Sequence, residues 1–295
     1  MRAGRLGEAV AFGVLTMTLA ACAAGAGDRA APAAPPISAE SAANTMTVGM
    51  ERRAGFLGRA ETPDATAVIP PAPREGESRN DLDWAIFRET RALEGSDRWL
   101  LARADNDFTP KALLKDFSCA VGADLTPENA PALASLLGRT TIDAGAAAEG
   151  AKQVYKRPRP YLHNPGPICI DGGEGLSRSF DYPSGHSSLG WMAGLVLAEL
   201  APDRATPVLQ RARAYGESRA VCGVHNMSAV EAGRTNAAGV FAALHGSTEF
   251  RAAMDKARTE IVSARASGTK PDAAACARED ALTKPLAIGV QGAAK

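Results

Sequence analysis

The sequence lacks an excess of charge of either sign and has few aromatic residues. Its 295 residues include 33 Lys and Arg against 33 Asp and Glu, and Phe, Trp and Tyr make up 5%. A chain without a basic excess lacks the electrostatic footprint of nucleic-acid-binding proteins, so we expect no nucleic-acid partner. Few aromatics together with abundant alanine favour close-packed helices over a sheet rich in aromatic and β-branched residues. We therefore predict an all-α fold.

The sequence also lacks an apolar run of the roughly twenty residues that a membrane-spanning helix needs. A shorter run, from Ala9 to Leu19, follows Arg2 and Arg5 and ends in the sequence Leu-Ala-Ala-Cys at Cys22. A basic start, a short apolar run and small residues are typical of an export signal, which we assign to residues 1–21. The ending resembles the box cleaved before a lipid-modified cysteine in bacterial lipoproteins. It predicts lipidation at Cys22 and anchoring to the outer membrane from the periplasmic side, with ordinary cleavage nearby as the alternative.

Residues 22–75 are rich in Ala, Gly and Pro and show no periodic apolar face. Such a composition predicts a flexible tether, followed by a single domain over residues 76–295. If Cys22 carries lipid, that anchor is the domain's only expected contact with a membrane.

Four cysteines remain after Cys22: Cys119, Cys169, Cys222 and Cys276. An even number in an exported protein predicts two disulfides. Of the three pairings, we favour Cys119 with Cys169 and Cys222 with Cys276, because the second would hold the C-terminal tail near the last motif described below, although the sequence does not decide. The cysteines lack the short paired spacing of a zinc site, and we expect neither a metal nor another cofactor.

Apolar spacing predicts helices over residues 81–101, 109–120, 132–155, 207–222, 226–245 and 247–266. Residues 187–200 are apolar nearly all round, which indicates a buried helix at the centre of a multi-helix bundle. Between Pro158 and Pro183, proline and glycine are too frequent for regular structure, so we predict a loop. Its aromatic residues Tyr161, Phe180 and Tyr182 could stack on a ligand, although such residues more often pack the core.

Three motifs concentrate the polar chemistry. Lys152 is followed after six residues by Arg159-Pro160, then comes Pro183-Ser184-Gly185-His186, and Ser218-Arg219 is followed after five residues by His225. Lysine and arginine offer charge-assisted donors to phosphate oxygens. Ser184 and Gly185 precede an expected helix start, where backbone N–H groups favour an anion. The motifs therefore indicate a phosphate site.

In this order and with these gaps, the motifs resemble the signature of the type 2 phosphatidic acid phosphatase superfamily, and within it of the soluble bacterial class A non-specific acid phosphatases. The resemblance extends from about Asp83 to His245. It implies a compact helical bundle of the acid phosphatase and haloperoxidase type, and a hydrolase that takes many small phosphomonoesters. It implies that His225 is the nucleophile that forms a phosphohistidine and that His186 is the general acid. The implied phosphate-binding residues are Lys152, Arg159, Ser184, Gly185 and Arg219.

One position departs from the family. Four residues after the nucleophilic histidine the family has an aspartate that accepts the Nδ1 proton, and this chain has Ala229. Glu231 would lie about 240° round the helix and face elsewhere. Ser228, a backbone carbonyl, or a carboxylate from another segment such as Asp181 or Glu217 could replace the aspartate, and the sequence does not choose among them.

The missing aspartate leaves alternatives to a fully active phosphatase. One is a phosphate-binding lipoprotein without turnover, and another is a vanadate-dependent haloperoxidase, because vanadate would bind in the same cradle. Since all the phosphate-contacting residues are kept, we favour an enzyme whose activity is intact or reduced. A homo-oligomer is compatible with the sequence, although no surface stripe requires one.

Overall fold

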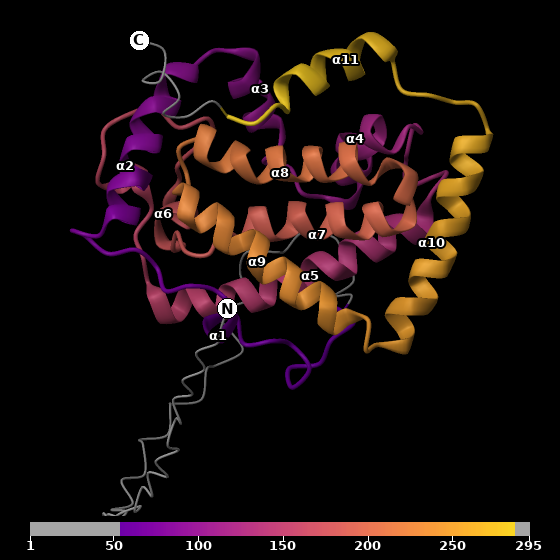
Figure 1. Cartoon of the computed structure of the whole chain (residues 1–295), viewed down its shortest axis with the longest axis horizontal. Helices are drawn as coiled ribbons and strands as arrows, with labels where there is room; N and C mark the ends of the chain where they lie inside the picture. The colour runs from indigo at the N-terminus through magenta and orange to yellow at the C-terminus, as the bar shows by residue number, and fades with distance from the viewer. Residues whose placement is uncertain (1–53, 287–295) are drawn as a thin grey trace, which may run out of the picture. The chain divides into compact units, whose positions relative to one another are not determined.

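The computed structural model describes residues 54–286, and every regular element in that range is helical (Figure 1). The prediction of an all-α fold is confirmed. The export signal, Cys22 and the first part of the expected tether lie outside the described residues. The α-helices are α1 (Ala65–Val68), α2 (Ser78–Thr90), α3 (Asp97–Ala104), α4 (Pro110–Val121), α5 (Pro131–Tyr155), α6 (Glu174–Arg178), α7 (Gly185–Leu200), α8 (Ala205–Val221), α9 (Met227–Leu244), α10 (Thr248–Ala266) and α11 (Ala273–Leu282). Short 3-10 turns cover Arg91–Leu93, Pro160–Leu162 and Pro202–Arg204.

Helix α7 lies at the centre and packs on α8, α9 and α5 (Figure 1). Its close approach to α8 depends on glycine, because a Cβ at Gly190 would overlap the ring of Tyr215 and one at Gly194 would overlap Ala212. Side chains on several sides of α7 are buried, including Met192, Val196 and Leu197. The predicted central helix is thus confirmed, and it begins at the motif that contains His186.

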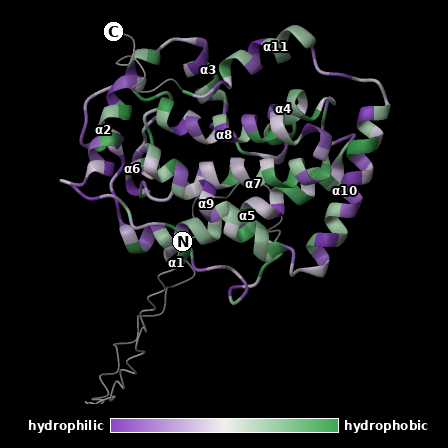
Figure 2. Cartoon of the chain, in the orientation of Figure 1, coloured by the Kyte–Doolittle hydropathy of each residue, from purple (hydrophilic) through white to green (hydrophobic). Residues whose placement is uncertain are grey.

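The main apolar core joins α7 to α4, α5 and α10. Leu113, Phe117, Leu133 and Leu137 are fully buried in it. Helix α10 adds Phe250, Met254 and Ile261 to the same core, and carries both apolar and polar residues along its length (Figure 2). No helix in the described part of the chain is long and apolar enough to cross a membrane.

The helix predicted over residues 81–101 is wrong, because the chain breaks there. Gly95 has φ of +75°, a left-handed conformation that stops a helix. The hydroxyl of Ser96 then accepts a hydrogen bond from the backbone N–H of Trp99 and caps the start of α3. Two helices therefore replace one. The other predicted helices correspond to α4, α5, α7, α8, α9 and α10, whereas α1, α6 and α11 were not predicted.

Residues 54–75, which the composition assigned to the tether, are packed against the helices. Phe56 and Ile69 are buried. The backbone N–H groups of Phe56 and Leu57 donate to the carboxylate of Asp143 on α5, at 2.8 and 3.2 Å. Residues 54–75 therefore belong to the packed domain, which extends further towards the N-terminus than the predicted boundary at residue 76.

Two disulfides are present, but the favoured pairing was wrong. Cys119 is bonded to Cys276, and Cys169 to Cys222. The segment between Pro158 and Pro183, here called the long loop, returns to the end of α8. There the N–H of Cys169 donates to the carbonyl of Cys222 at 3.0 Å, which brings the two sulfurs together. Cys276 lies on α11, a helix that the sequence analysis missed and that brings the C-terminal tail to α4.

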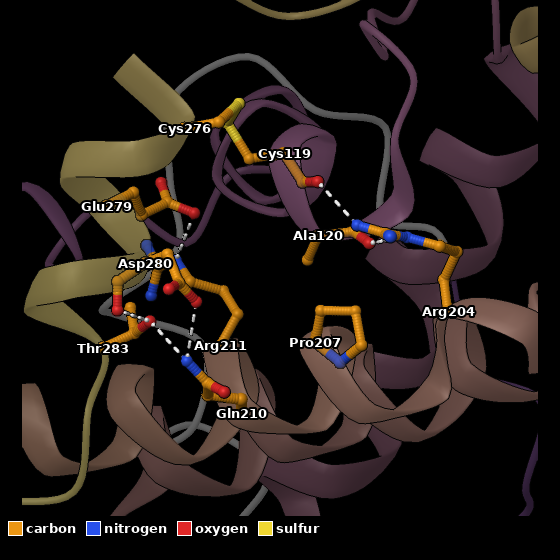
Figure 3. Close-up of a pocket in the computed structure, with 10 residues that line it drawn as sticks. All are labelled: Cys119, Ala120, Arg204, Pro207, Gln210, Arg211, Cys276, Glu279, Asp280 and Thr283. Carbon is orange, nitrogen blue, oxygen red and sulfur yellow. Dashed lines mark hydrogen bonds and ion pairs between the residues drawn. A yellow bond between two sulfur atoms is a disulfide. The ribbon is translucent and has the colours of Figure 1, made fainter. Parts of the chain in front are cut away.

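A pocket of about 210 Å³ lies beside the Cys119–Cys276 disulfide (Figure 3). Its polar side chains bind one another: Glu279 lies 3.5 Å from Arg211, and the amide of Gln210 donates to Asp280 at 3.0 Å. None of the residues predicted to bind phosphate lines it.

Candidate active site

The three sequence motifs lie at the C-terminal ends of α5 and α8 and at the N-terminal end of α7. Lys152 lies in the last turn of α5 and Arg219 in the last turn of α8. His186 lies in the first turn of α7, and His225 lies in the turn between α8 and α9. Lys152 is 7% exposed, and Arg219 and His225 are 1% and 2% exposed. Gly185 and His186 are half-buried, so solvent reaches the site at the start of α7.

The local sequence explains how α5 and α7 present their residues to the site. Helix α5 ends at Tyr155, and the next residue, Lys156, caps it in a left-handed conformation with φ of 47°. Pro158 and Pro160 prevent the helix from continuing, and Arg159 lies between them in the sequence. The hydroxyl of Ser184 caps α7 by accepting from the N–H of Ser187. This cap leaves the backbone N–H groups of Gly185 and His186 ahead of the intrahelical hydrogen bonds, in the geometry that suits an anion.

Lys152 and Arg159 converge on one small residue. Nζ of Lys152 lies 3.3 Å from Oγ of Ser179, and Nη2 of Arg159 lies 3.1 Å from the same atom. Nε of Arg159 donates to the carbonyl of Ser179 at 2.7 Å. No motif in the sequence marks Ser179, which reaches the site through the fold of the long loop.

Arg219 has buried donors without partners. Its Nε and Nη1 are buried and make no hydrogen bond to any residue that the structure describes. A buried unsatisfied donor is costly, especially on a charged group. Two such donors on one guanidinium, next to other cations, therefore suit a site that binds an anion.

Burial and mutual repulsion act on the cations. Burial, and then the charge of Arg159, lower the pKa of Lys152 to about 8. The same two causes, in the same order, lower the pKa of Arg219 to about 10. An anion bound among Lys152, Arg159 and Arg219 would relieve this repulsion and stabilise their charged forms.

The tautomer of His225 follows from its neighbours. Nδ1 lies 2.8 Å from the backbone carbonyl oxygen of Asp181 and 2.9 Å from its carboxylate Oδ1. Nε2 lies 3.0 Å from Nη1 of Arg159. A carbonyl only accepts and a guanidinium only donates, so the proton is on Nδ1 and the lone pair is on Nε2. Burial and the charges of Arg159 and Lys152 keep the pKa of His225 well below its usual value, so the ring stays neutral.

His186 is the second histidine of the site, and the charge of Arg219 acts on it. Its Nε2 lies 3.2 Å from the carbonyl oxygen of Asn106, and its ring packs edge-on against Phe108 with centroids 4.9 Å apart. Burial, and then the charge of Arg219, lower its pKa. In the described part of the chain, no group of three or more His, Cys, Asp or Glu side chains is arranged to hold a metal ion.

The chain is similar to known acid phosphatases. Residues 132–252 match the model of the PAP2 superfamily. The chain is 41% identical over 214 residues to an acid phosphatase of Zymomonas mobilis, an alignment that covers 72% of this chain and 81% of that protein. It is 34% identical over 208 residues to a non-specific acid phosphatase of Providencia stuartii, with 70% and 84% covered. For the non-specific acid phosphatase of Salmonella typhimurium, the identity is 32% over 203 residues, with 68% and 81% covered.

The chain belongs to the class A non-specific acid phosphatases of the PAP2 superfamily. It is therefore a member of a family of hydrolases that act on phosphoric monoesters.

The structure of this acid phosphatase separates the candidates for the missing orienting group. Ser228 donates its hydroxyl proton to Asp83 at 2.5 Å. Glu217 forms ion pairs with arginines on α8 and α9, and Glu231 is exposed. Two of the candidates named from the sequence contact Nδ1 of His225, and both belong to Asp181: its carboxylate and its backbone carbonyl.

The aromatic residues of the loop differ in position. Tyr182 is fully buried, and its hydroxyl donates to the carbonyl of Pro70 at 2.6 Å, so it packs the core. Tyr161 and Phe180 are half-buried. Three residues around the site were not singled out from the sequence: Ser179, Arg157 and Asn226. Arg157 lies between the two cations of the first motif, which is the only signal that marks any of them.

Proposed function

We propose that this acid phosphatase hydrolyses phosphomonoesters through a phosphohistidine formed at Nε2 of His225, with His186 as the general acid. The observation that carries the proposal is a neutral His225 whose Nε2 lone pair points into a cluster of buried cations. Nε2 is in contact with Arg159, and two donors of Arg219 have no partner among the described residues.

In the first step, Lys152, Arg159 and Arg219 bind the three non-bridging oxygens of the phosphoryl group, with help from the N–H groups at the start of α7. Nε2 of His225 attacks phosphorus, and the bond between phosphorus and the ester oxygen breaks. His186 gives its proton to the departing oxygen, so the alcohol leaves neutral. The fixed cations stabilise the charge that develops on the equatorial oxygens.

In the second step, a water molecule attacks the phosphorus of the phosphohistidine and gives a proton to His186. The bond between phosphorus and Nε2 breaks, and inorganic phosphate leaves. The cations and the burial that lower the pKa of His186 in the free enzyme are offset when an anionic ester is bound, because a negative charge favours the imidazolium. Binding of the substrate thus charges the acid that the first step needs.

Broad specificity for small phosphomonoesters fits the distribution of these contacts. The cations around His225 suit a phosphoryl group, whereas the half-buried aromatic residues Tyr161 and Phe180 are available to an organic leaving group. Stacking of this kind tolerates many ring systems.

Export and anchoring are part of the same proposal. Two disulfides are expected in an oxidising compartment and are rare in the cytosol. We infer that the protein is exported to the periplasm and held at the outer membrane by lipid on Cys22. Replacement by Cys22→Ser should release the protein from the membrane fraction, while an unchanged membrane fraction would contradict the anchor.

The catalytic proposal is tested with the full chain and its His225→Ala variant. We expect the wild-type protein to hydrolyse p-nitrophenyl phosphate between pH 4 and pH 8 in the presence of a chelator, with turnover reduced by about three or more powers of ten in the variant. An unchanged circular dichroism spectrum would show that the variant is folded. Hydrolysis at the wild-type rate by His225→Ala would overturn the mechanism.

A second measurement identifies the intermediate. Labelled phosphoester mixed with excess enzyme and quenched in alkali should leave label on the wild-type chain and none on His225→Ala. Tight binding of inorganic phosphate without hydrolysis by the wild type would instead identify a phosphate-binding protein. Bromide oxidation with added vanadate in the absence of phosphoester hydrolysis would identify a haloperoxidase.

A further inference from the structure

The carboxylate of Asp181 reaches His225 from a different segment than the family's orienting aspartate. In this chain, the family position is Ala229, which is fully buried among small and apolar side chains. Asp181 lies in the loop just before α7, and its Oδ1 is 2.9 Å from Nδ1 of His225. A carboxylate is thus present at the His225 ring, although the position that supplies it in the family is occupied here by the uncharged Ala229.

The surroundings of Asp181 are those of an ionised carboxylate. Oδ1 also accepts from the backbone N–H of Asn226 at 3.1 Å, and Oδ2 accepts from the side-chain amide of Asn226 at 2.8 Å. Oδ2 lies 3.4 Å from Nη1 of Arg157. Every one of these partners is a donor. Burial raises the pKa of Asp181 above its usual value, and Arg157 and Asn226 partly offset that rise by favouring the anion.

Asp181 is also held in place. Its backbone N–H donates to the carbonyl of Arg157 at 2.8 Å. Arg157 is fixed in turn by Asp83 on α2 at 2.9 Å and by Ser228 on α9 at 2.9 Å. The carboxylate therefore sits on a buried framework that joins α2, the long loop and α9, and it has little freedom to leave Nδ1.

We propose that Asp181 is the positioning residue of His225, and that it supplies from the loop before α7 the carboxylate that Ala229 cannot supply. This inference rests on the proposed function of His225 as the nucleophile. When Nε2 bonds to phosphorus, the ring becomes a cation with its proton on Nδ1. The Asp181 carboxylate stabilises that cation, and the proton stays on Nδ1 throughout. When water displaces the ring, the cation disappears again.

The backbone carbonyl of Asp181 offers a competing explanation, because it lies 2.8 Å from the same nitrogen. A carbonyl can fix the tautomer, but it brings no negative charge to offset the nearby cations Arg159, Lys152 and Arg219. Substitution of the side chain leaves the carbonyl in place, so side-chain variants distinguish the two.

The first experiment compares Asp181→Asn with the wild type, using p-nitrophenyl phosphate for kcat and inorganic phosphate for inhibition. An amide can still accept from Nδ1 but carries no charge. We expect kcat to fall by about two to four powers of ten, by analogy with triads that lack their aspartate. The inhibition constant for inorganic phosphate should stay within about threefold, because the cation cluster is intact. Asp171→Asn, an exposed aspartate of the same loop, is the matched control and should behave as wild type.

Rescue separates a positioning role from a purely structural one. The double variant Asp181→Asn with Ala229→Asp restores a carboxylate one turn after His225, and we expect it to recover at least about tenfold of the lost kcat. The acid limb of kcat/KM should also move to lower pH in Asp181→Asn, because loss of an anion lowers the pKa of the His225 ring. A merely structural role for Asp181 would produce neither change.

Some outcomes would overturn the inference. One is a folded Asp181→Asn variant that keeps kcat within about threefold of the wild type. The single variant Ala229→Asp provides a second test, which can be used even if Asp181→Asn does not fold. Since the ring is already held, Ala229→Asp should leave kcat unchanged or lower it, and a rise of about tenfold or more would show that the ring lacks a carboxylate. If the wild type itself hydrolyses no phosphoester, the proposed function fails, and that result is distinct from an active wild type that tolerates Asp181→Asn.

Discussion

Nη1 of Arg159 lies 3.0 Å from Nε2 of His225, so a cation of the proposed phosphate site touches the nitrogen proposed to attack phosphorus. The same Nη1 donates to the carbonyl of Val224 at 2.8 Å, and Nε donates to the carbonyl of Ser179. These bonds fix the plane of the guanidinium beside the imidazole. A phosphoryl group that binds to Arg159 is therefore delivered next to the lone pair of His225.

This contact predicts that Arg159→Lys is not a conservative change. A lysine keeps the charge but loses the planar fork that binds carbonyls and phosphate together. We expect kcat/KM for p-nitrophenyl phosphate to fall about a hundredfold or more. Arg178→Lys is the control, because Arg178 is exposed on the same loop and pairs only with Glu174 among the contacts described. Equal activities of the two variants would contradict the assigned role of Arg159.

The lowered pKa of Lys152, about 8, predicts a loss of phosphate affinity in alkali. Below that value the amine is charged, and as the pH rises through it the free enzyme loses a cation. Burial and the cations Arg159 and Arg219 lower the pKa, and Glu149 and Asp181 partly offset them. The inhibition constant for inorganic phosphate should therefore rise once the pH exceeds about 8.

The variant Lys152→Arg tests the source of this dependence. The ordinary pKa of a guanidinium lies well above that of an amine, so the rise in the inhibition constant near pH 8 should disappear, even if binding is weaker overall. The same rise in the variant would mean that another group titrates.

The two disulfides should differ in their effect on activity. Chain entropy alone predicts that each contributes about 4–5 kcal/mol to the free energy of unfolding, for separations of 53 and 157 residues. Cys169→Ser with Cys222→Ser should lower both Tm and kcat, because Cys222 follows Arg219 and Cys169 holds the loop that contains Ser179. Cys119→Ser with Cys276→Ser should lower Tm and keep kcat within about twofold at temperatures where the protein is folded. Thermal unfolding and p-nitrophenyl phosphate assays on both double variants check this, and equal loss of kcat would contradict it.

The buried ion pair between Arg211 and Asp105 also binds Ser218 of the third motif. Nη2 of Arg211 lies 2.6 Å from Oδ1 of Asp105, and the hydroxyl of Ser218 donates to Oδ2 at 2.5 Å. Asp105→Ala leaves the fully buried Arg211 without this carboxylate, and we expect the free energy of unfolding in urea to fall by about 3–5 kcal/mol. Asp105→Ala with Arg211→Met removes both charges and should cost less than Asp105→Ala alone. If the double variant is the less stable one, the ion pair is not what Asp105 contributes.

The sequence by itself determined the family, the all-α fold class, the candidate site residues and most of the helices. Lys152, Arg159, His186, Arg219 and His225 could be named because each motif is short, and short-range spacing survives any packing of the helices. The central helix α7 could be placed because its apolar residues run nearly all round, a property of the segment alone. The all-α class followed from composition for the same reason.

Tertiary structure decided what depends on distant segments meeting. The sequence left Asp181 as one of several candidates to hold His225, and only the folded loop brings it to Nδ1 while Asp83 and Arg157 occupy Ser228. The disulfide pairing could not be predicted because α11 is short and has no strong apolar face. Phe56 and its neighbours were assigned to a tether because their burial depends on Asp143, which is 87 residues away in the chain from Phe56. The spacing of nearby residues can be read from the sequence, whereas contacts between distant segments form only when the helices pack.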